Sequence, residues 1–200
     1  HRLDSTGVIP EAIKDVLDTE IKNKVGYMPT LQVINGLREL TDSNYLNDPE
    51  LEHVLPNELI AYYKANSNTM YANVFGNAPK NIISNNFNRI SNQGKVSMKY
   101  MNDHGGHLLF GADTPSSPTL EMENAGIPLG KILAMATIEN AKAFNLEKLY
   151  GTVEEGKKAN LLILNKNPLQ DIMAYNDIEQ VIINGQSLNR KNLSAKNVDE

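Results

Sequence analysis

The residue whose position best suits chemistry is Asp113, which follows the short apolar run that begins at His107. Such a run between glycines is typical of a buried parallel strand, and ligands of α/β proteins bind at the carboxyl ends of such strands. A carboxylate there can coordinate a metal ion and accept a proton from metal-bound water. An aspartate before threonine and proline also caps turns. The local pattern therefore leaves both interpretations of Asp113 open.

The histidines are weaker candidates for a metal site. His104 and His107 are separated by two glycines, which disfavours a helical pair, and on a strand their rings would face opposite sides. We therefore interpret His107 as a residue at the start of a strand. His53 lies in a charged, polar context that predicts a solvated side chain. Nothing precedes His1, so its surroundings alone say nothing about its role.

Several classes of site are excluded by what the sequence lacks. It has no cysteine, which excludes disulfides, thiolate zinc sites and cysteine nucleophiles, so any metal must be held by histidine and carboxylate. Ser116-Ser117 has no Gly-x-Ser-x-Gly context, and neither a dinucleotide fingerprint nor a P-loop occurs. An aspartyl phosphotransferase would need a second aspartate two residues from Asp113, where Gly111 and Pro115 stand.

Composition and charge narrow the partners. The 200 residues are 40% hydrophobic and 22% charged, which is ordinary for a globular protein, and the formal net charge is −5. Without a basic block, the chain has no electrostatic reason to bind nucleic acid or an anionic membrane. No apolar run approaches the roughly 20 residues that span a bilayer. The first residues do not have the pattern of a signal peptide, and the sequence indicates no compartment.

The elements that would position Asp113 begin with an amphipathic helix over Ile9–Lys24 and a short strand over Tyr27–Val33. From Asn35 to Gly94 the chain is polar, asparagine-rich and weakly periodic. We predict a long, largely irregular insertion there, with helical pieces in Pro56–Asn66 and Asn81–Ile90.

Regular periodicity returns with a helix over Val96–Asn102, in which Met98 and Met101 are predicted to fill the core. The strand that leads to Asp113 follows, and then a helix over Pro128–Phe144. Strands and helices thus alternate, which indicates an α/β protein.

The tail has a different pattern. Ala159–Leu164 and Ile178–Ile183 read as strands, and Asn184-Gly185 after the second is a strong signal for a hairpin turn. We predict a small β module over residues 150–189. Residues 190–200 are polar and are predicted to be a frayed tail.

Several segments, in fixed order, resemble motifs of the metal-dependent amidohydrolase superfamily, in particular its imidazolonepropionase-like branch. The matching segments are Met28–Leu31, Phe110–Pro115, Ala125–Pro128, Leu133–Thr137, Asn140-Ala141, Gly151–Leu161, Asn167–Ile172 and Val181–Gly185. The resemblance is dense from about residue 105 to 188. Each motif is weak alone, and the ordered set is specific.

The resemblance implies the C-terminal portion of a (β/α)8 TIM-type barrel and part of a small β-sandwich module. Residues 1–149 would then be the distal part of the barrel, strands six to eight, with the insertion at about 35–94. The family implies one or two divalent metal ions, with zinc our expectation. Asp113 would be the general base and acid as well as a metal ligand. His1 would be a second metal ligand at the end of strand six.

The implied activity is hydrolysis of carbon–nitrogen bonds other than peptide bonds in a small-molecule substrate; a homo-oligomer is compatible with it. The family's His-x-His and its strand-four and strand-five ligands are absent, and a full barrel takes about 250 residues. We therefore expect a C-terminal part of a longer protein, inactive alone. Asn160 stands where the family has aspartate. The alternative is a non-catalytic α/β binding or scaffold protein that keeps the fold without a complete metal site.

Overall fold

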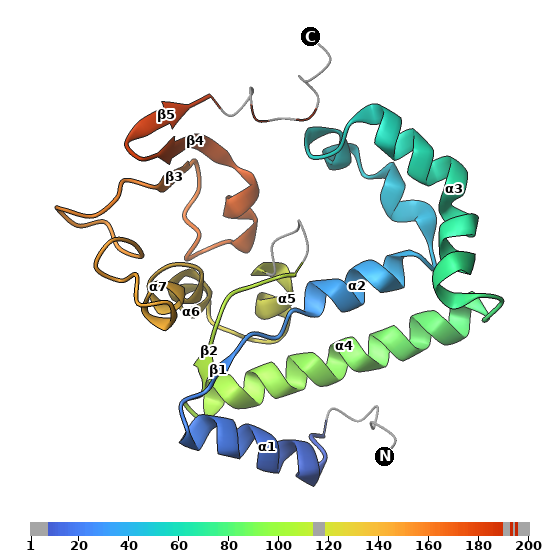
Figure 1. Cartoon of the computed structure of the whole chain (residues 1–200), viewed down its shortest axis with the longest axis horizontal. Helices are drawn as coiled ribbons and strands as arrows, with labels where there is room; N and C mark the ends of the chain where they lie inside the picture. The colour runs from blue at the N-terminus through green and yellow to red at the C-terminus, as the bar shows by residue number, and fades with distance from the viewer. Residues whose placement is uncertain (1–7, 114–118, 190–192, 194, 196–200) are drawn as a thin grey trace.

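The computed structural model describes residues 8–113, 119–189, 193 and 195, and shows a mixed α/β chain (Figure 1). The long helix α4 (Lys80–Asp103) crosses the lower part of the view, with α1 (Glu11–Lys22) beneath its C-terminal half. A three-stranded sheet lies at the upper left. None of the helices in the described part of the chain combines the length and apolar character that a membrane crossing requires.

Helix α1 confirms the predicted amphipathic helix, with bounds two residues inside the expected ones at each end. It begins after Pro10, whose fixed φ and missing N–H suit a helix start. Its apolar stripe turns Leu17 into the core, with Ile13 and Ile21 packed beside it. This stripe holds the helix against α4.

A two-stranded parallel sheet lies beside the C-terminal end of α4 (Figure 1). Strand β1 (Gly26–Tyr27) pairs with β2 (His107–Leu108), with Gly26 opposite His107 and Tyr27 opposite Leu108. The Leu109 N–H donates to the Tyr27 carbonyl at 2.9 Å, which extends the ladder by one bond. His107 thus starts a strand, as predicted. Residues 81 positions apart in the chain are brought side by side.

The strand predicted over Tyr27–Val33 was wrong beyond Tyr27, because α2 (Leu31–Glu39) is helical. Its residues Leu31 and Asn35, one turn apart, are both buried, which is a helical spacing. Leu31 packs against Gly94 of α4 so closely that a Cβ at that glycine would overlap its side chain. Contact with a distant helix therefore decides the structure here.

The helical pieces predicted in Pro56–Asn66 and Asn81–Ile90 are confirmed, but the rest of the region from 35 to 94, predicted to be irregular, is also mainly helical. After α2 come two 3₁₀ turns, η1 (Ser43–Asn47) and η2 (Pro49–His53), then α3 (Asn57–Phe75) and α4. Phe75 contacts Phe87 edge to face, with ring centroids 5.8 Å apart, and the Tyr71 hydroxyl donates to the Ala78 carbonyl at 2.7 Å. These contacts join α3 to α4 and stabilise helices whose asparagine-rich faces have weak periodicity.

The segment after β2 completes the core with α5 (Thr119–Asn124), α6 (Leu129–Ala134), the π-helical turn η3 (Met135–Glu139) and α7 (Asn140–Ala143). The predicted helix over Pro128–Phe144 is thereby confirmed, with a π turn inside it. The side chains with almost no exposure come from α4, β2 and these helices: Met98, Met101, Leu108, Met122, Ile132 and Met135. The predicted core role of Met98 and Met101 is confirmed.

The tail forms the predicted β elements. Strand β3 (Leu161–Leu164) pairs antiparallel with β4 (Ile178–Ile183), which pairs with β5 (Gln186–Leu188), and η4 (Ile172–Asn176) lies between β3 and β4. Asn184 and Gly185 both have positive φ, 50° and 79°, as a two-residue hairpin turn of type I′ requires. The described residues of the tail form a three-stranded antiparallel sheet, and the β-sandwich that the resemblance implied stays a prediction.

Candidate functional site

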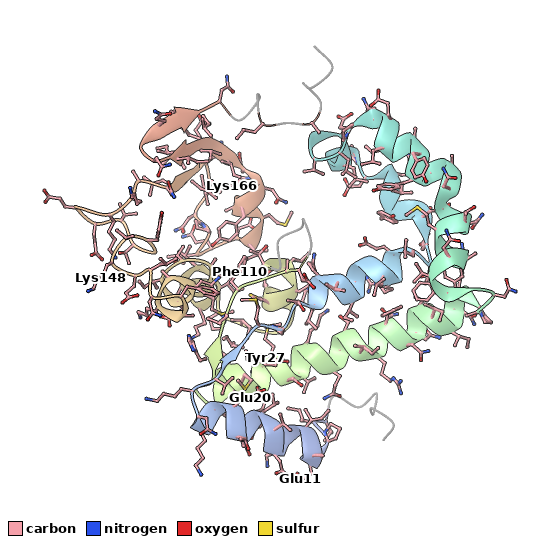
Figure 2. All side chains as sticks on the ribbon, viewed as in Figure 1. Glu11, Glu20, Tyr27, Phe110, Lys148 and Lys166 are labelled. Atoms are coloured by element: carbon pink, nitrogen blue, oxygen red, sulfur yellow. The ribbon has the colours of Figure 1, made fainter. Side chains whose placement is uncertain are left out.

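The candidate site is at the carboxyl ends of β1 and β2. The two strands are parallel, so the segments that follow β1 and β2 leave the sheet on the same side. Burial falls along the segment that begins with β2: Leu108 is fully buried, Phe110 is partly buried and Asp113 is exposed. Figure 2 shows Tyr27 in β1 and Phe110 in the neighbouring segment after β2. The buried strand therefore delivers Asp113 to the surface, as the sequence predicted.

Asp113 has a left-handed backbone conformation, with φ of 55°. Aspartate adopts this conformation more readily than most residues, yet it is uncommon outside glycine. Residues 114–118 lie outside the described structure, so the interpretation of Asp113 as a turn cap stays a prediction. His1 also lies outside the described residues, and its role as a metal ligand stays a prediction.

The segment before Asp113 is fixed by Asn140, a residue to which sequence reasoning assigned no role. The Phe110 N–H donates to Asn140 Oδ1 at 3.0 Å, and Asn140 Nδ2 donates to the Phe110 carbonyl at 2.7 Å. One side-chain amide thus satisfies both backbone groups of Phe110, as a neighbouring strand would. In the sequence, Asn140 stood out only as part of the motif Asn140-Ala141, to which no role was assigned.

A second contact holds the same segment from the β1 side. Gly111 faces Met28, and a Cβ at Gly111 would overlap Met28 Sδ and lie 3.0 Å from Cγ. A side chain at Gly111 would displace the Met28 side chain, which is 38% exposed. The contact explains why a glycine precedes Ala112-Asp113.

The two histidines near the sheet belong to different elements, His104 to the end of α4 and His107 to β2. His104 ends α4, where its ring stacks on Tyr100 with centroids 3.9 Å apart and its Nδ1 lies 2.9 Å from the Tyr100 carbonyl. Across the described ranges, no group of three or more histidine, aspartate or glutamate side chains is arranged to hold a metal ion. The described part of the chain, with Asp113 as its candidate ligand, does not make a metal centre by itself.

The side chains beside the strand ends differ in their acid–base character. Burial, and then the negative charge of Glu20, raise the pKa of the Tyr27 phenol above its ordinary value. Tyr27 therefore stays protonated at neutral pH and cannot accept a proton there. The role of Asp113 as a base stays a prediction.

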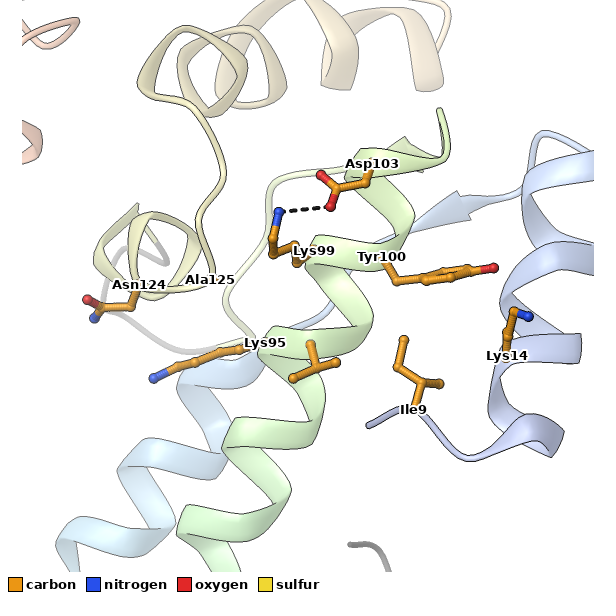
Figure 3. Close-up of a pocket in the computed structure, with 9 residues that line it drawn as sticks. Ile9, Lys14, Lys95, Lys99, Tyr100, Asp103, Asn124 and Ala125 are labelled. Atoms are coloured by element: carbon orange, nitrogen blue, oxygen red, sulfur yellow. Dashed lines mark hydrogen bonds and ion pairs between the residues drawn. The ribbon is translucent and has the colours of Figure 1, made fainter. Parts of the chain in front are cut away.

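A hollow of about 590 Å³ lies elsewhere, between α1, α4 and the end of α5 (Figure 3). It is lined by Ile9, Lys14, Lys99, Tyr100, Asp103 and Asn124 among others. Lys99 Nζ lies 2.8 Å from Asp103 Oδ2, and the neighbouring Lys95 lies 3.1 Å from Glu121, so these amines already have carboxylate partners. The hollow does not include Asp113, and we do not assign the chemistry to it.

The comparison with protein families decides to which family this chain belongs. The model of the amidohydrolase family matches residues 88–188, which is half of the chain and includes β2, Asp113, Asn140 and the β module. This chain belongs to the amidohydrolase family. The resemblance found in the ordered motifs is thereby confirmed.

Curated amidohydrolase relatives carry the name 5-methylthioadenosine/S-adenosylhomocysteine deaminase. The protein of Caldanaerobacter subterraneus subsp. tengcongensis is 24% identical over 199 residues, which cover 94% of this chain and 45% of that protein. The protein of Moorella thermoacetica is 36% identical over 74 residues, 31% of this chain and 17% of its own length. The chain thus spans less than half the length of these curated relatives.

Among solved structures, a Xaa-Pro dipeptidase with bound methionine in its active site has a similar fold. Its TM-score is 0.59 at 20% identity, over 87% of this chain and 37% of that one. At this identity the likeness concerns the fold alone. It supports a mixed α/β arrangement shared by the amidohydrolase chain and the dipeptidase.

Proposed function

We propose that the protein is a metal-dependent hydrolase of carbon–nitrogen bonds other than peptide bonds, with Asp113 as its general base and acid. The observation that carries the proposal is the match to the amidohydrolase family over the segment that delivers Asp113 from a buried strand to the surface. The relatives named as deaminases support the same class of bond.

In the proposed reaction, Asp113 accepts a proton from the attacking water. The water oxygen bonds to the amide-type carbon, the carbon–nitrogen bond breaks, and Asp113 returns the proton to the leaving nitrogen. The reaction therefore consumes one water molecule and leaves Asp113 ionised at the end of the cycle. The exposed position of Asp113 at the strand end gives a small-molecule substrate access to its carboxylate.

The proposal includes a divalent metal ion, zinc being our choice, that would supply a nucleophilic water at neutral pH. Asp113 and His1 are the ligands we propose from this chain. Further ligands would have to come from outside the described residues, which hold no cluster of three. The proposal also includes a barrel of which β1 and β2 are two neighbouring strands.

The test uses the full-length protein, its metal content and the variant Asp113→Asn. Ammonia release from 5-methylthioadenosine and S-adenosylhomocysteine is measured beside hydrolysis of cyclic amides and of Xaa-Pro dipeptides. General acid–base catalysis contributes roughly 10²–10⁴-fold, so Asp113→Asn should lower kcat by that factor. Asparagine tolerates the left-handed conformation of this position, so the variant should fold normally.

Asp15→Asn, on the exposed face of α1, is the matched control and should keep full activity. A protein with no bound zinc, manganese or nickel, together with full function of Asp113→Asn, would instead mark a non-catalytic binding or scaffold protein. Cleavage of Xaa-Pro dipeptides in preference to the other substrates would overturn the choice of bond.

A further inference from the structure

The side chain of Asn140 reaches the chain end that carries Asp113 across 30 residues of sequence. Its amide both accepts from the Phe110 N–H, at 3.0 Å, and donates to the Phe110 carbonyl, at 2.7 Å. Phe110 lies two residues after β2 and three before Asp113. The paired bonds restrain the position and the rotation of the peptide groups on both sides of Phe110, which one bond would not.

The orientation of Asn140 is set by the helix that carries it. The π turn Met135–Glu139 ends at the residue before Asn140 and contains one residue more than an α turn would. That extra residue changes the direction in which the following side chains leave the helix axis. The fully buried Met135 and the buried Ala141 fix the helix on either side of Asn140. Its amide is therefore held in place before any substrate arrives.

The segment around Gly151 packs against the same π turn. Gly151 lies against the helix so tightly that a Cβ there would be 2.8 Å from Ile138 Cα and 3.0 Å from Ala141 Cβ. These neighbours flank Asn140 in the chain. The arrangement leaves the π turn little freedom to move away from Phe110.

The Asp113 conformation needs such support. A non-glycine residue with φ of 55° is strained, and such residues persist where the surrounding structure holds them. Met28 lies against Gly111 on the β1 side, and Asn140 is hydrogen-bonded to Phe110 on the helix side. The segment Phe110–Asp113 is thus fixed by two unrelated parts of the chain just before its carboxylate becomes exposed.

We propose that Asn140 is a positioning residue for Asp113, which through its paired hydrogen bonds to Phe110 fixes where the Asp113 carboxylate lies. The inference rests on the proposed role of Asp113 as base. Asn140 itself would contact neither substrate nor metal, and its effect on catalysis would pass through Asp113 alone.

The test is a double-mutant cycle in the full-length protein with Asn140→Ala, Asp113→Asn and the pair. A misplacement of about 1 Å lowers rates roughly 10²-fold, so Asn140→Ala should reduce kcat by that factor and leave KM within about threefold. In the Asp113→Asn background, Asn140→Ala should change kcat by less than about threefold, because residues that act as a unit are non-additive. The substrate is whichever deaminase or cyclic-amide probe the wild type turns over.

Two further measurements separate positioning from general damage to the fold. Hydrogen exchange of the Phe110 amide should rise at least tenfold in Asn140→Ala, with β4 amides unchanged. Asn160→Ala, which removes a comparable side chain–backbone bond in the β module, is the matched control and should keep wild-type kcat. If Asn140→Ala does not fold, Asn140→Asp keeps the shape and the acceptor, loses the donor, and enters the same cycle.

The outcomes are distinct. Wild-type kcat in a folded Asn140 variant, or a full multiplicative loss in the Asp113→Asn background, would overturn the positioning role. If Asn140→Ala speeds exchange at Phe110 but Asp113→Asn is fully active, the proposed function is overturned. The paired hydrogen bonds of Asn140 to Phe110 would then have no role in catalysis. Loss confined to backgrounds that contain Asp113 supports both.

Discussion

Met28 and Gly111 meet across the carboxyl ends of the two parallel strands with no space for a side chain on the glycine. A Cβ at Gly111 would overlap Met28 Sδ and lie 3.0 Å from Cγ and 3.2 Å from Cε. The contact joins residues 83 positions apart, directly before Asp113, and is made by the partly exposed side chain of Met28.

The first prediction concerns Gly111→Ala, which should destabilise the protein and reduce activity. Overpacking costs about 1–3 kcal/mol, and we expect the lower end of this range because the flexible Met28 side chain, 38% exposed, can shift to accommodate the new methyl group. The measurement is the denaturant midpoint together with kcat. Adding Met28→Ala should recover part of both losses, since it removes the overlapping atoms. A double variant no better than Gly111→Ala would show that the glycine is needed for another reason.

The second prediction concerns the contact of α2 with α4. Gly94→Ala gains about 1 kcal/mol of helix propensity, but its Cβ would overlap Leu31 Cδ2 and lie 3.3 Å from Cδ1. Leu31 is buried, so its side chain cannot move aside without disturbing the interface. We expect a net loss of about 1–2 kcal/mol in the free energy of unfolding.

The matched control for Gly94→Ala is Gly36→Ala in α2. A Cβ at Gly36 meets nothing within 4 Å, so this substitution should stabilise the protein by up to about 1 kcal/mol. Both are measured by thermal and urea unfolding of the full-length protein. If Gly94→Ala also stabilises, the interface of α2 with α4 is looser than the structure indicates.

Elements fixed by local chemistry could be predicted from the sequence. Pro10 and the apolar spacing of α1 gave its bounds to within two residues, and Asn184-Gly185 gave the hairpin between β4 and β5. The strand that leads to Asp113 was also predicted, although its paired part is only His107–Leu108. These signals depend on neighbours in the chain, which is why they were visible.

The errors occur where a distant contact decides. Leu31–Val33 reads as a strand because its apolar residues follow Pro29, but burial against Gly94 makes it helical. Helix α3 has apolar residues on several faces, and the contact of Phe75 with Phe87 that stabilises it crosses a turn. The paired hydrogen bonds between Asn140 and Phe110 were not predicted, because bonds between residues 30 positions apart leave no local pattern.

The third prediction concerns alkaline stability. The hydrogen bond from the Tyr100 hydroxyl to Asp18 Oδ1, 2.7 Å long, raises the pKa of Tyr100 from 10.0 to about 12, with desolvation and the charges of Asp18 and Glu11 acting in the same direction. A group whose pKa is higher in the folded protein than in the unfolded one contributes its full stabilisation at any pH below the unfolded-state pKa. That contribution is lost as pH rises through the folded value.

The stability of the wild type should therefore fall between about pH 10 and 12, and Tyr100→Phe should show a shallower fall in this window. Urea midpoints measured across the window for both proteins give the comparison. The difference in ultraviolet absorbance between them reports ionisation of this phenol directly. Equal pH dependence of the two proteins would remove the hydrogen bond to Asp18 as the cause.

The last prediction concerns Asn160, where the family has aspartate. The Asn184 N–H donates to Asn160 Oδ1 at 2.7 Å, and the Gly185 N–H donates to the Ala159 carbonyl at 2.9 Å, so the β4–β5 turn is attached to the start of β3. An acceptor is all that this position requires, which either residue type supplies. Asn160→Ala should cost about 0.5–1.5 kcal/mol, the net value of a typical hydrogen bond.

Asn160→Asp should keep or increase the wild-type stability at neutral pH, because a carboxylate accepts the same bond with its charge. The bond would lower the pKa of the new carboxyl in the folded state. The gain should therefore be present above the unfolded pKa, near 3.9, and be lost as pH falls through the lower folded value. Thermal unfolding of the three proteins from pH 7 down to pH 3 tests this. An Asn160→Asp variant as unstable as Asn160→Ala at pH 7 would mean that the position needs the amide N–H₂ group and not only an acceptor.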